Sequence, residues 1–136
     1  MRNSFLFILI IIGVLFSNCK KEETFKTTTI EGKLVNHETQ LPIIGKTMEL
    51  NEKIRSNVLS YEVHIEEAMS DENGIFKFNY TEKSKLDNTL TLATSFDLEL
   101  EFSSAIINGV EENLFFRDGL KIEKGGDYYF EIELIP

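Results

Sequence analysis

Residue types that build many common protein sites are scarce in this chain of 136 residues. There is one cysteine, so an intrachain disulfide is impossible and the core must hold the fold together. Two histidines and that cysteine are too few for a tetrahedral zinc site of the usual cysteine and histidine type. Basic residues number 14 against 23 acidic ones, and this formal net charge of -9 argues against binding to nucleic acid. The length and the 42% of hydrophobic residues predict one globular domain.

The longest apolar run lies at the N-terminus. Residues 5–16 include no polar side chain and follow the basic Arg2. The run is shorter than the roughly 20 helical residues that span a bilayer core. A short basic start, an apolar run and then small polar residues are typical of a secretory signal. We expect residues 1–18 to be a signal peptide, with a buried strand as the alternative.

The single cysteine directly follows this run, in Phe16-Ser17-Asn18-Cys19. The segment resembles the lipobox of bacterial lipoproteins, in which the cysteine thiol receives a diacylglyceryl group and becomes the mature N-terminus. The resemblance implies a lipid anchor on Cys19 and a location in the cell envelope, at the outer membrane. An ordinary signal peptide with an incidental cysteine is the alternative. Each buried CH₂ contributes about 0.8 kcal/mol, so several acyl chains would hold the protein at the membrane.

A short charged segment follows the cysteine and consists of Lys20, Lys21, Glu22 and Glu23. It resembles the surface-export signal of lipoproteins in the Bacteroidetes. A charged, flexible tether that lifts the domain off the membrane is the other interpretation. We therefore expect residues 19–26 to be the lipidated cysteine and its tether, and residues 27–136 to be the folded domain.

From Phe25 onward the dominant hydrophobic period is two, and no segment has a long amphipathic helical pattern. Such alternation places successive side chains on opposite faces of a strand. Strands are expected at residues 27–35, 46–50, 61–66, 76–80, 90–92, 98–102 and 130–134. Residues 103–113 fit either a loop or a short turn of helix. The pattern predicts an all-β fold, an antiparallel Greek-key β-sandwich of about seven strands.

Three motifs between residues 28 and 80 resemble carboxypeptidase-regulatory-like domains, whose β-sandwich is of the transthyretin type. They are the strand Ile30 to Val35 with Gly32 inside it, the connection Pro42-Ile43-Ile44-Gly45, and the turn Asp71-Glu72-Asn73-Gly74 before Phe76 and Phe78. In that family these motifs specify turns and core. The resemblance therefore implies a scaffold and names no binding partner.

The residue chemistry of these motifs supports the same interpretation. We expect Gly74 to adopt a positive φ in a tight hairpin, next to Asp71 and Asn73. Phe76 and Phe78 point the same way from one strand and should enter the core. Gly32 should mark a bulge or a close approach of the opposite sheet.

Acidic residues raise the question of a cation site. The turn Asp71-Glu72-Asn73-Gly74 lacks the spaced carboxylates of a calcium loop, so we interpret it as a structural turn. Six outward-facing acids could form a patch or belong to an ordinary solvated face in which they alternate with Lys33 and Lys77. They are Glu62, Glu66, Glu99, Glu101, Glu131 and Glu133. The solvated face is favoured, and no metal or cofactor is expected.

Few residues suggest catalysis. Some transthyretin-like proteins are hydrolases that use histidine and arginine, and this chain has His37, Arg55 and His64 but lacks their C-terminal signature. Beside Gly125-Gly126, the pair Tyr128-Tyr129 could offer an aromatic contact at a loop tip. In a strand, however, one of these tyrosines would face the core and the other the rim.

The sequence thus predicts a lipid-anchored cell-envelope protein with a non-catalytic β-sandwich that serves as an interaction or structural module. Its expected partners are the membrane, through the lipid on Cys19, and an envelope protein or a glycan. A carbohydrate- or cation-binding module is the alternative, and a transthyretin-like hydrolase is less favoured.

Overall fold

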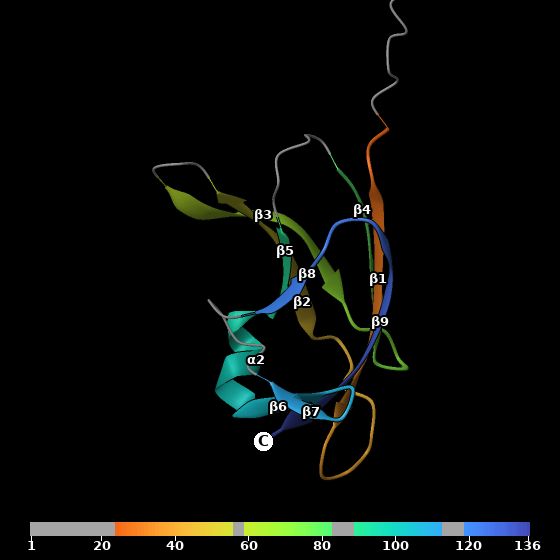
Figure 1. Ribbon diagram of the computed structural model, residues 1–136. Coiled ribbons are helices and arrows are strands. Elements are labelled where there is room, and N and C mark those ends of the chain that lie inside the picture. Colours follow the sequence, from red (N-terminus) through yellow and green to blue (C-terminus); the bar gives the residue numbers. More distant parts are fainter. Residues whose placement is uncertain (1–23, 56–58, 83–88, 113–118) are drawn as a thin grey trace, which may run out of the picture.

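A computed structural model describes residues 24–55, 59–82, 89–112 and 119–136 (Figure 1). The predicted signal peptide, Cys19 and the charged segment Lys20 to Glu23 lie outside the described residues. The strands of the described part are β1 (Thr27–Asn36), β2 (Thr47–Arg55), β3 (Ser60–Met69), β4 (Ile75–Thr81), β5 (Thr89–Thr94), β6 (Ser104–Ile107), β7 (Val110–Glu112), β8 (Leu120–Ile122) and β9 (Gly126–Ile135).

These strands form two sheets that face each other. One has the order β4-β1-β9-β6-β7 and the other the order β3-β2-β5-β8, so the chain crosses repeatedly between them (Figure 1). The predicted all-β Greek-key sandwich is confirmed, with nine strands in the described ranges instead of about seven. One pair departs from the antiparallel expectation, because β1 and β9 run parallel from Thr28↔Gly126 to Asn36↔Leu134.

The core lies between the sheets and is built from the alternate residues of each strand. The sheet that contains β1 contributes Phe76 and Phe78, each 1% exposed, and their rings meet edge to face at 6.0 Å. The opposite sheet contributes Met48 and Leu50, both fully buried. The predicted core position of the two phenylalanines is therefore confirmed. Burying such side chains stabilises the fold by roughly 1.5–3 kcal/mol each.

Residues 98–102 do not form the expected strand. They fall in and after a short helix, α2 (Phe96–Glu101), in which Leu98 is fully buried and Leu100 is 74% exposed. Residues two apart on a helix point in nearly opposite directions, whereas on a strand both leucines would face the core. An alternation this short fits both structures, and Leu and Glu are good helix formers.

The segment 103–113, expected as a loop or a helical turn, contains the hairpin of β6 and β7. Its turn is Asn108-Gly109, and both residues have positive φ, 49° and 84°. An Asn-Gly pair with two positive φ angles matches the right-handed twist of paired strands. This dipeptide is the sequence signal that would have predicted the hairpin.

Gly32 lies where a neighbouring ring leaves no room for a side chain. A Cβ built on Gly32 would lie 2.4 Å from Cζ of Phe76, its partner on β4. The close approach therefore comes from the adjacent strand of the same sheet and not from the opposite sheet. The register of β1 is regular at Gly32, and a register shift lies instead between β2 and β3 at Leu50/Asn51.

The turn of residues 71–74 connects the two sheets, because β3 and β4 belong to different ones. It is therefore not the expected hairpin, although Gly74 has the expected positive φ of 77°. The Asp71 carboxylate accepts hydrogen bonds from the backbone N–H groups of Asn73 and Ile75, both at 2.8 Å. These bonds fix the direction in which the chain leaves the turn.

The connection between β1 and β2 packs against this turn. Pro42 forms an isolated bridge with Val35, and Ile43 donates its N–H to the Leu34 carbonyl at 3.0 Å. Gly45 has a φ of 70° and donates its N–H to the carbonyl of Ser70. The connection of residues 42–45 and the turn of residues 71–74 thus meet at one end of the sandwich.

Gly45 and Gly74 have similar positive φ angles but different surroundings, so replacing each by alanine distinguishes backbone strain from steric clash. A Cβ on Gly74 would lie 2.4 Å from the carbonyl oxygen of Leu34, whereas a Cβ on Gly45 meets nothing within 4 Å. We expect Gly45→Ala to lower the free energy of unfolding by about 1–2 kcal/mol, the cost of a left-handed alanine. Gly74→Ala should lower it by about 3 kcal/mol or more, because backbone must also shift. Urea unfolding of both variants checks this, and equal losses would contradict the proposed clash.

Candidate functional site

A cluster of largely buried charges lies at the end of the sandwich where β1 begins. Lys124, just before β9, places Nζ 2.5 Å from Oε1 of Glu52 on β2 and 3.6 Å from Oε1 of Glu82 after β4. The side chains of Lys124, Glu52 and Glu82 are only 5%, 16% and 9% exposed. Nζ also lies 5.7 Å from the ring centroid of Tyr80, whose hydroxyl donates to Glu52. The cluster therefore joins the two sheets.

The electrostatics of this cluster keep Lys124 charged. Burial alone would lower the pKa of Lys124, but the hydrogen bond and the attraction of Glu52 outweigh it and raise the pKa above 10.5. Burial and the nearby Glu52 likewise raise the pKa of Tyr80 above 10.0. A lysine that stays protonated at neutral pH cannot act as a nucleophile or a general base. The arrangement is therefore suited to holding structure together.

The same cluster fixes the start of β1. Glu82 accepts a hydrogen bond from the backbone N–H of Lys26 at 3.4 Å, and its own N–H donates to the Lys26 carbonyl at 2.9 Å. Beside it, Gly125 donates its N–H to Oγ1 of Thr28 at 2.8 Å. The first described residues are thus tied to β4 and to the segment before β9. Hydrophobic periodicity carried no signal for this cluster, because its members are far apart along the chain.

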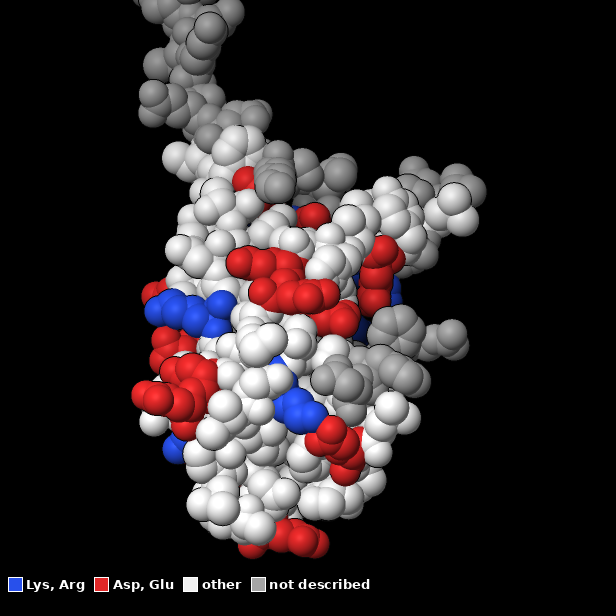
Figure 2. Space-filling view, turned by 180° about the vertical axis from the view of Figure 1, so that it is seen from behind, with Lys and Arg blue, Asp and Glu red and all other residues white. Residues whose placement is uncertain are grey.

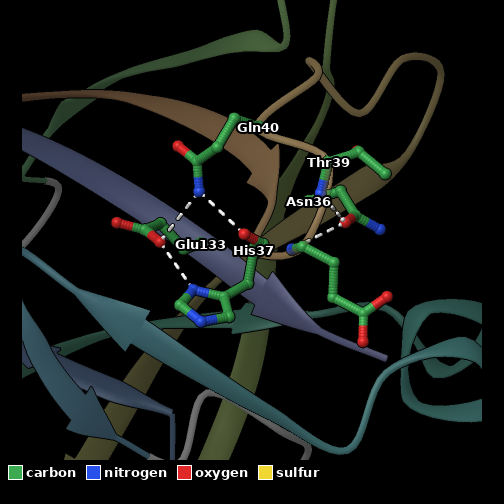
Figure 3. Close-up of polar contacts among 6 residues, drawn as sticks. Asn36, His37, Thr39, Gln40 and Glu133 are labelled. Atoms are coloured by element: carbon green, nitrogen blue, oxygen red, sulfur yellow. Dashed lines mark hydrogen bonds and ion pairs between the residues drawn. The ribbon is translucent and has the colours of Figure 1, made fainter.

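A second polar cluster lies at the other end of β1, in the turn after Asn36 (Figure 3). His37 Nδ1 lies 2.7 Å from Oε2 of Glu133, and Gln40 donates from Nε2 to the His37 carbonyl at 2.8 Å. The side-chain oxygen of Asn36 accepts from the N–H groups of Glu38 and Thr39. These bonds stabilise a turn in which Gln40 has a φ of 57°.

The His37–Glu133 hydrogen bond has the geometry by which a carboxylate orients a catalytic histidine. The hydrogen bond from His37, with that from Gln40, lowers the pKa of Glu133 below 4.5. A carboxylate that holds one imidazole nitrogen prepares the other for proton transfer only if a nucleophile lies within reach. Among the described residues, the hydrogen bonds of the His37 ring go to Glu133 alone. The pair therefore closes the turn against β9.

The candidate hydrolase residues do not converge. His64 lies on β3, where Nδ1 is 3.3 Å from Oδ1 of Asn51 and Nε2 is 3.7 Å from Oε1 of Glu67. His37 contacts β9, in the opposite sheet. Arg55 is the last residue of β2, and its side chain lies outside the described part. The two histidines thus have separate partners.

The six acids expected to face solvent are spread over three elements. Glu62 and Glu66 lie on β3, Glu99 and Glu101 on α2, and Glu131 and Glu133 on β9. On the face seen in Figure 2, acidic side chains form several groups with basic and uncharged residues between them.

A basic residue lies opposite Glu131, one of the six acids, and another lies beside Glu31, a further acid of the same sheet. Lys77 lies 3.2 Å from Glu31, and Lys33 is opposite Glu131 in the β1–β9 register. Within the described ranges, no group of three or more histidine, cysteine or acidic side chains is placed to hold a metal ion.

The tyrosine pair is divided between the two faces of β9. Tyr128 packs against the core, stacks on Phe130 at 6.2 Å and donates its hydroxyl to the Glu123 carbonyl. Tyr129 is 56% exposed. The pair lies inside the strand and not at a loop tip, so Tyr129 is the aromatic side chain that the pair offers to solvent.

No family model and no curated protein matches the sequence. Among solved structures, the chain is similar to a 9R-lipoxygenase from Cyanothece PCC8801, with 18% identity and a TM-score of 0.36. The match covers 80% of this chain and 16% of the lipoxygenase chain. At that level it carries no argument about activity. In the described part of the chain, no helix has the length and hydrophobicity needed to cross a membrane.

Replacing Lys124 tests the buried cluster. Lys124→Met would remove the buried cation that Glu52 and Glu82 share, so we expect it to lower the free energy of unfolding by about 3 kcal/mol. The matched variant Lys46→Met removes the partner of the exposed Glu101 and should cost less than about 1 kcal/mol. Urea unfolding at pH 7 measures both, and similar losses would contradict the role of Lys124.

The pH dependence of the stability difference between wild type and Lys124→Met gives a second test of the buried cluster. Because folding raises the pKa of Lys124, its contribution is complete below its ordinary value of 10.5 and is lost as the pH rises through the folded value. The difference between wild type and Lys124→Met should therefore persist at pH 9 and shrink only in stronger alkali. A difference that fell between pH 7 and pH 9 would disagree with this sign.

Proposed function

We propose that this chain is a lipid-anchored protein of the cell envelope whose β-sandwich is a non-catalytic interaction module. The observation that carries the proposal is the pair of hydrogen bonds that ties the backbone of Lys26 to Glu82, which we call the Lys26 clamp. Lys26 lies seven residues after Cys19. Seven residues reach at most about 25 Å when extended, so a lipid on Cys19 would hold the sandwich near the bilayer surface. The Lys26 clamp would fix the direction in which the chain passes from the tether into β1.

The roles of the polar side chains support a module without chemistry of its own. Lys124 is held as a cation between two carboxylates, and His37 closes a turn against Glu133. His64 lies between Asn51 and Glu67 on an exposed strand. Each of these three groups, which could otherwise act as an acid, a base or a nucleophile, thus has a partner that gives it a structural role.

The direction of β1 determines which end of the sandwich would lie farther from the anchor. β1 leads from Thr27 at one end of the sandwich to Asn36 at the other, where the turn before β4 and the C-terminus also lie (Figure 1). If Cys19 carries lipid, this far end would face away from the membrane. The sheet edges would remain open to a partner in the envelope.

Metabolic labelling tests the anchor. In cells that produce the full chain and are fed a clickable fatty acid, we expect the wild type to be labelled and to sediment with membranes. Cys19→Ser should lose the label and become soluble. The double variant Cys19→Ser/Thr24→Cys, which moves the thiol by five residues, should also stay unlabelled because the signal for modification precedes position 19. An unlabelled wild type, or label retained in Cys19→Ser, would contradict the proposal.

A further inference from the structure

The edge strand β3 is regular and open over residues 60–64, before the register shift at Leu50/Asn51. It ends the sheet β3-β2-β5-β8 and pairs with β2 alone within the described part. Its ten residues, SYEVHIEEAM, include neither proline nor lysine, two residues that commonly protect an edge from another strand. Tyr61 is 53% exposed and Val63 is 38% exposed. The regular part of this edge, residues 60–64, with apolar side chains in solvent, is a surface that a further strand could cover.

The two faces of this edge differ in character. Tyr61 and Val63 lie on one face, opposite Ile54 and Glu52 of β2. Glu62 and His64 alternate with them and lie on the other face, opposite Lys53 and Asn51. A partner strand would therefore need apolar residues on one face and, on the other, a basic group beside Glu62 and an acidic group beside His64.

The sequence of β3 itself meets this requirement. Around Val63 it reads Tyr61-Glu62-Val63-His64-Ile65, which alternates apolar residues with one acid and one basic residue. Two copies that pair antiparallel with Val63 at the centre place Glu62 opposite His64 of the partner subunit. Ile65, which the register shift leaves without a partner on β2, ends the regular part of the strand, so the match covers residues 62–64. The Glu62 carboxylate can accept a hydrogen bond from the imidazole of His64 across the two strands, and such cross-strand polar pairs stabilise strand pairing.

Neighbouring registers lack this match. Centring the pair on Glu62 places that carboxylate opposite its own copy, and centring it on His64 places Glu62 opposite Glu66 of the partner subunit. Like charges directly opposite each other are destabilising. With a formal net charge of -9 on each chain, the local match around Val63 is needed to offset general repulsion.

We propose that the edge strand β3 binds a second copy of this chain, antiparallel and centred on Val63, to form a symmetric dimer with one continuous eight-stranded sheet. Such an interface uses the same surface on both subunits. The proposal rests on the proposed interaction function and names its partner. Anchoring would raise the effective concentration of the modules at the membrane and so favour the dimer.

A cysteine at the symmetry axis tests the register in the full chain. Facing residues in antiparallel strands have Cα atoms about 4.5–5.5 Å apart, within the usual range for a disulfide. In isolated membranes, mild oxidation should convert most of the Val63→Cys protein to a covalent dimer. Tyr61→Cys should stay largely monomeric, because its two copies lie four residues apart along the strands, about 13 Å. The wild type, with Cys19 alone, gives the baseline.

Charge reversal in the Val63→Cys background tests the Glu62–His64 match. His64→Glu should reduce the covalent dimer at least about fivefold, the change expected from opposed carboxylates. The exchange Glu62→His with His64→Glu should restore it, which also shows that the strand still forms. Asn79→Glu, an exposed position on the edge strand β4 of the other sheet, adds the same charge and should change nothing.

Three results would overturn this dimer. They are equal cross-linking of Val63→Cys and Tyr61→Cys, monomeric Val63→Cys both in membranes and in concentrated detergent solution, and capture of a different protein by the Val63→Cys variant in place of its own copy. Fatty-acid labelling of the same samples keeps the two proposals distinguishable. A labelled but monomeric protein would refute the dimer and leave the anchor standing.

Discussion

The parallel pairing of β1 with β9 is the interaction on which the rest of the structure depends. It joins the first and last strands of the described chain over nine residue pairs, from Thr28↔Gly126 to Asn36↔Leu134. Antiparallel pairing would have placed the start of β1 beside the end of β9. Because the pair is parallel, β1 begins at one end of the sandwich and Pro136 lies at the other (Figure 1). Thr27 and Ile135 therefore lie at opposite ends of the sandwich.

Polar contacts reinforce this arrangement at both ends of β1. Where β1 begins, Lys124 bridges Glu52 and Glu82, and Glu82 holds the backbone of Lys26. At the far end, the His37–Glu133 pair ties the turn after β1 to β9. Burying charges is costly unless they are paired. In the buried cluster the ion pairs of Lys124 with Glu52 and Glu82 offset that cost, and they join segments that are distant in sequence.

Local alternation predicted the long strands, because β1, β4 and β9 each keep one buried face over many residues. It failed at residues 98–102, where five alternating residues fit a helix as well as a strand and packing of Leu98 decided the outcome. The Asn108-Gly109 turn carried a readable signal that was missed. The Lys124–Glu52 contact could not be read at all, since it joins positions 72 apart and depends on how the sheets face each other.

Native-state hydrogen exchange of the β1 amides tests the central role of β1 most directly. If the β1–β9 pairing holds the sandwich together, the slowest amides of Glu31, Lys33 and Val35, which alternate with the β4-facing Leu34 amide and so face β9, should exchange only through global unfolding. Their opening free energy should then equal the free energy of unfolding from urea denaturation. Exchange of these amides through local opening, at rates like those of the exposed strand β7, would contradict the account.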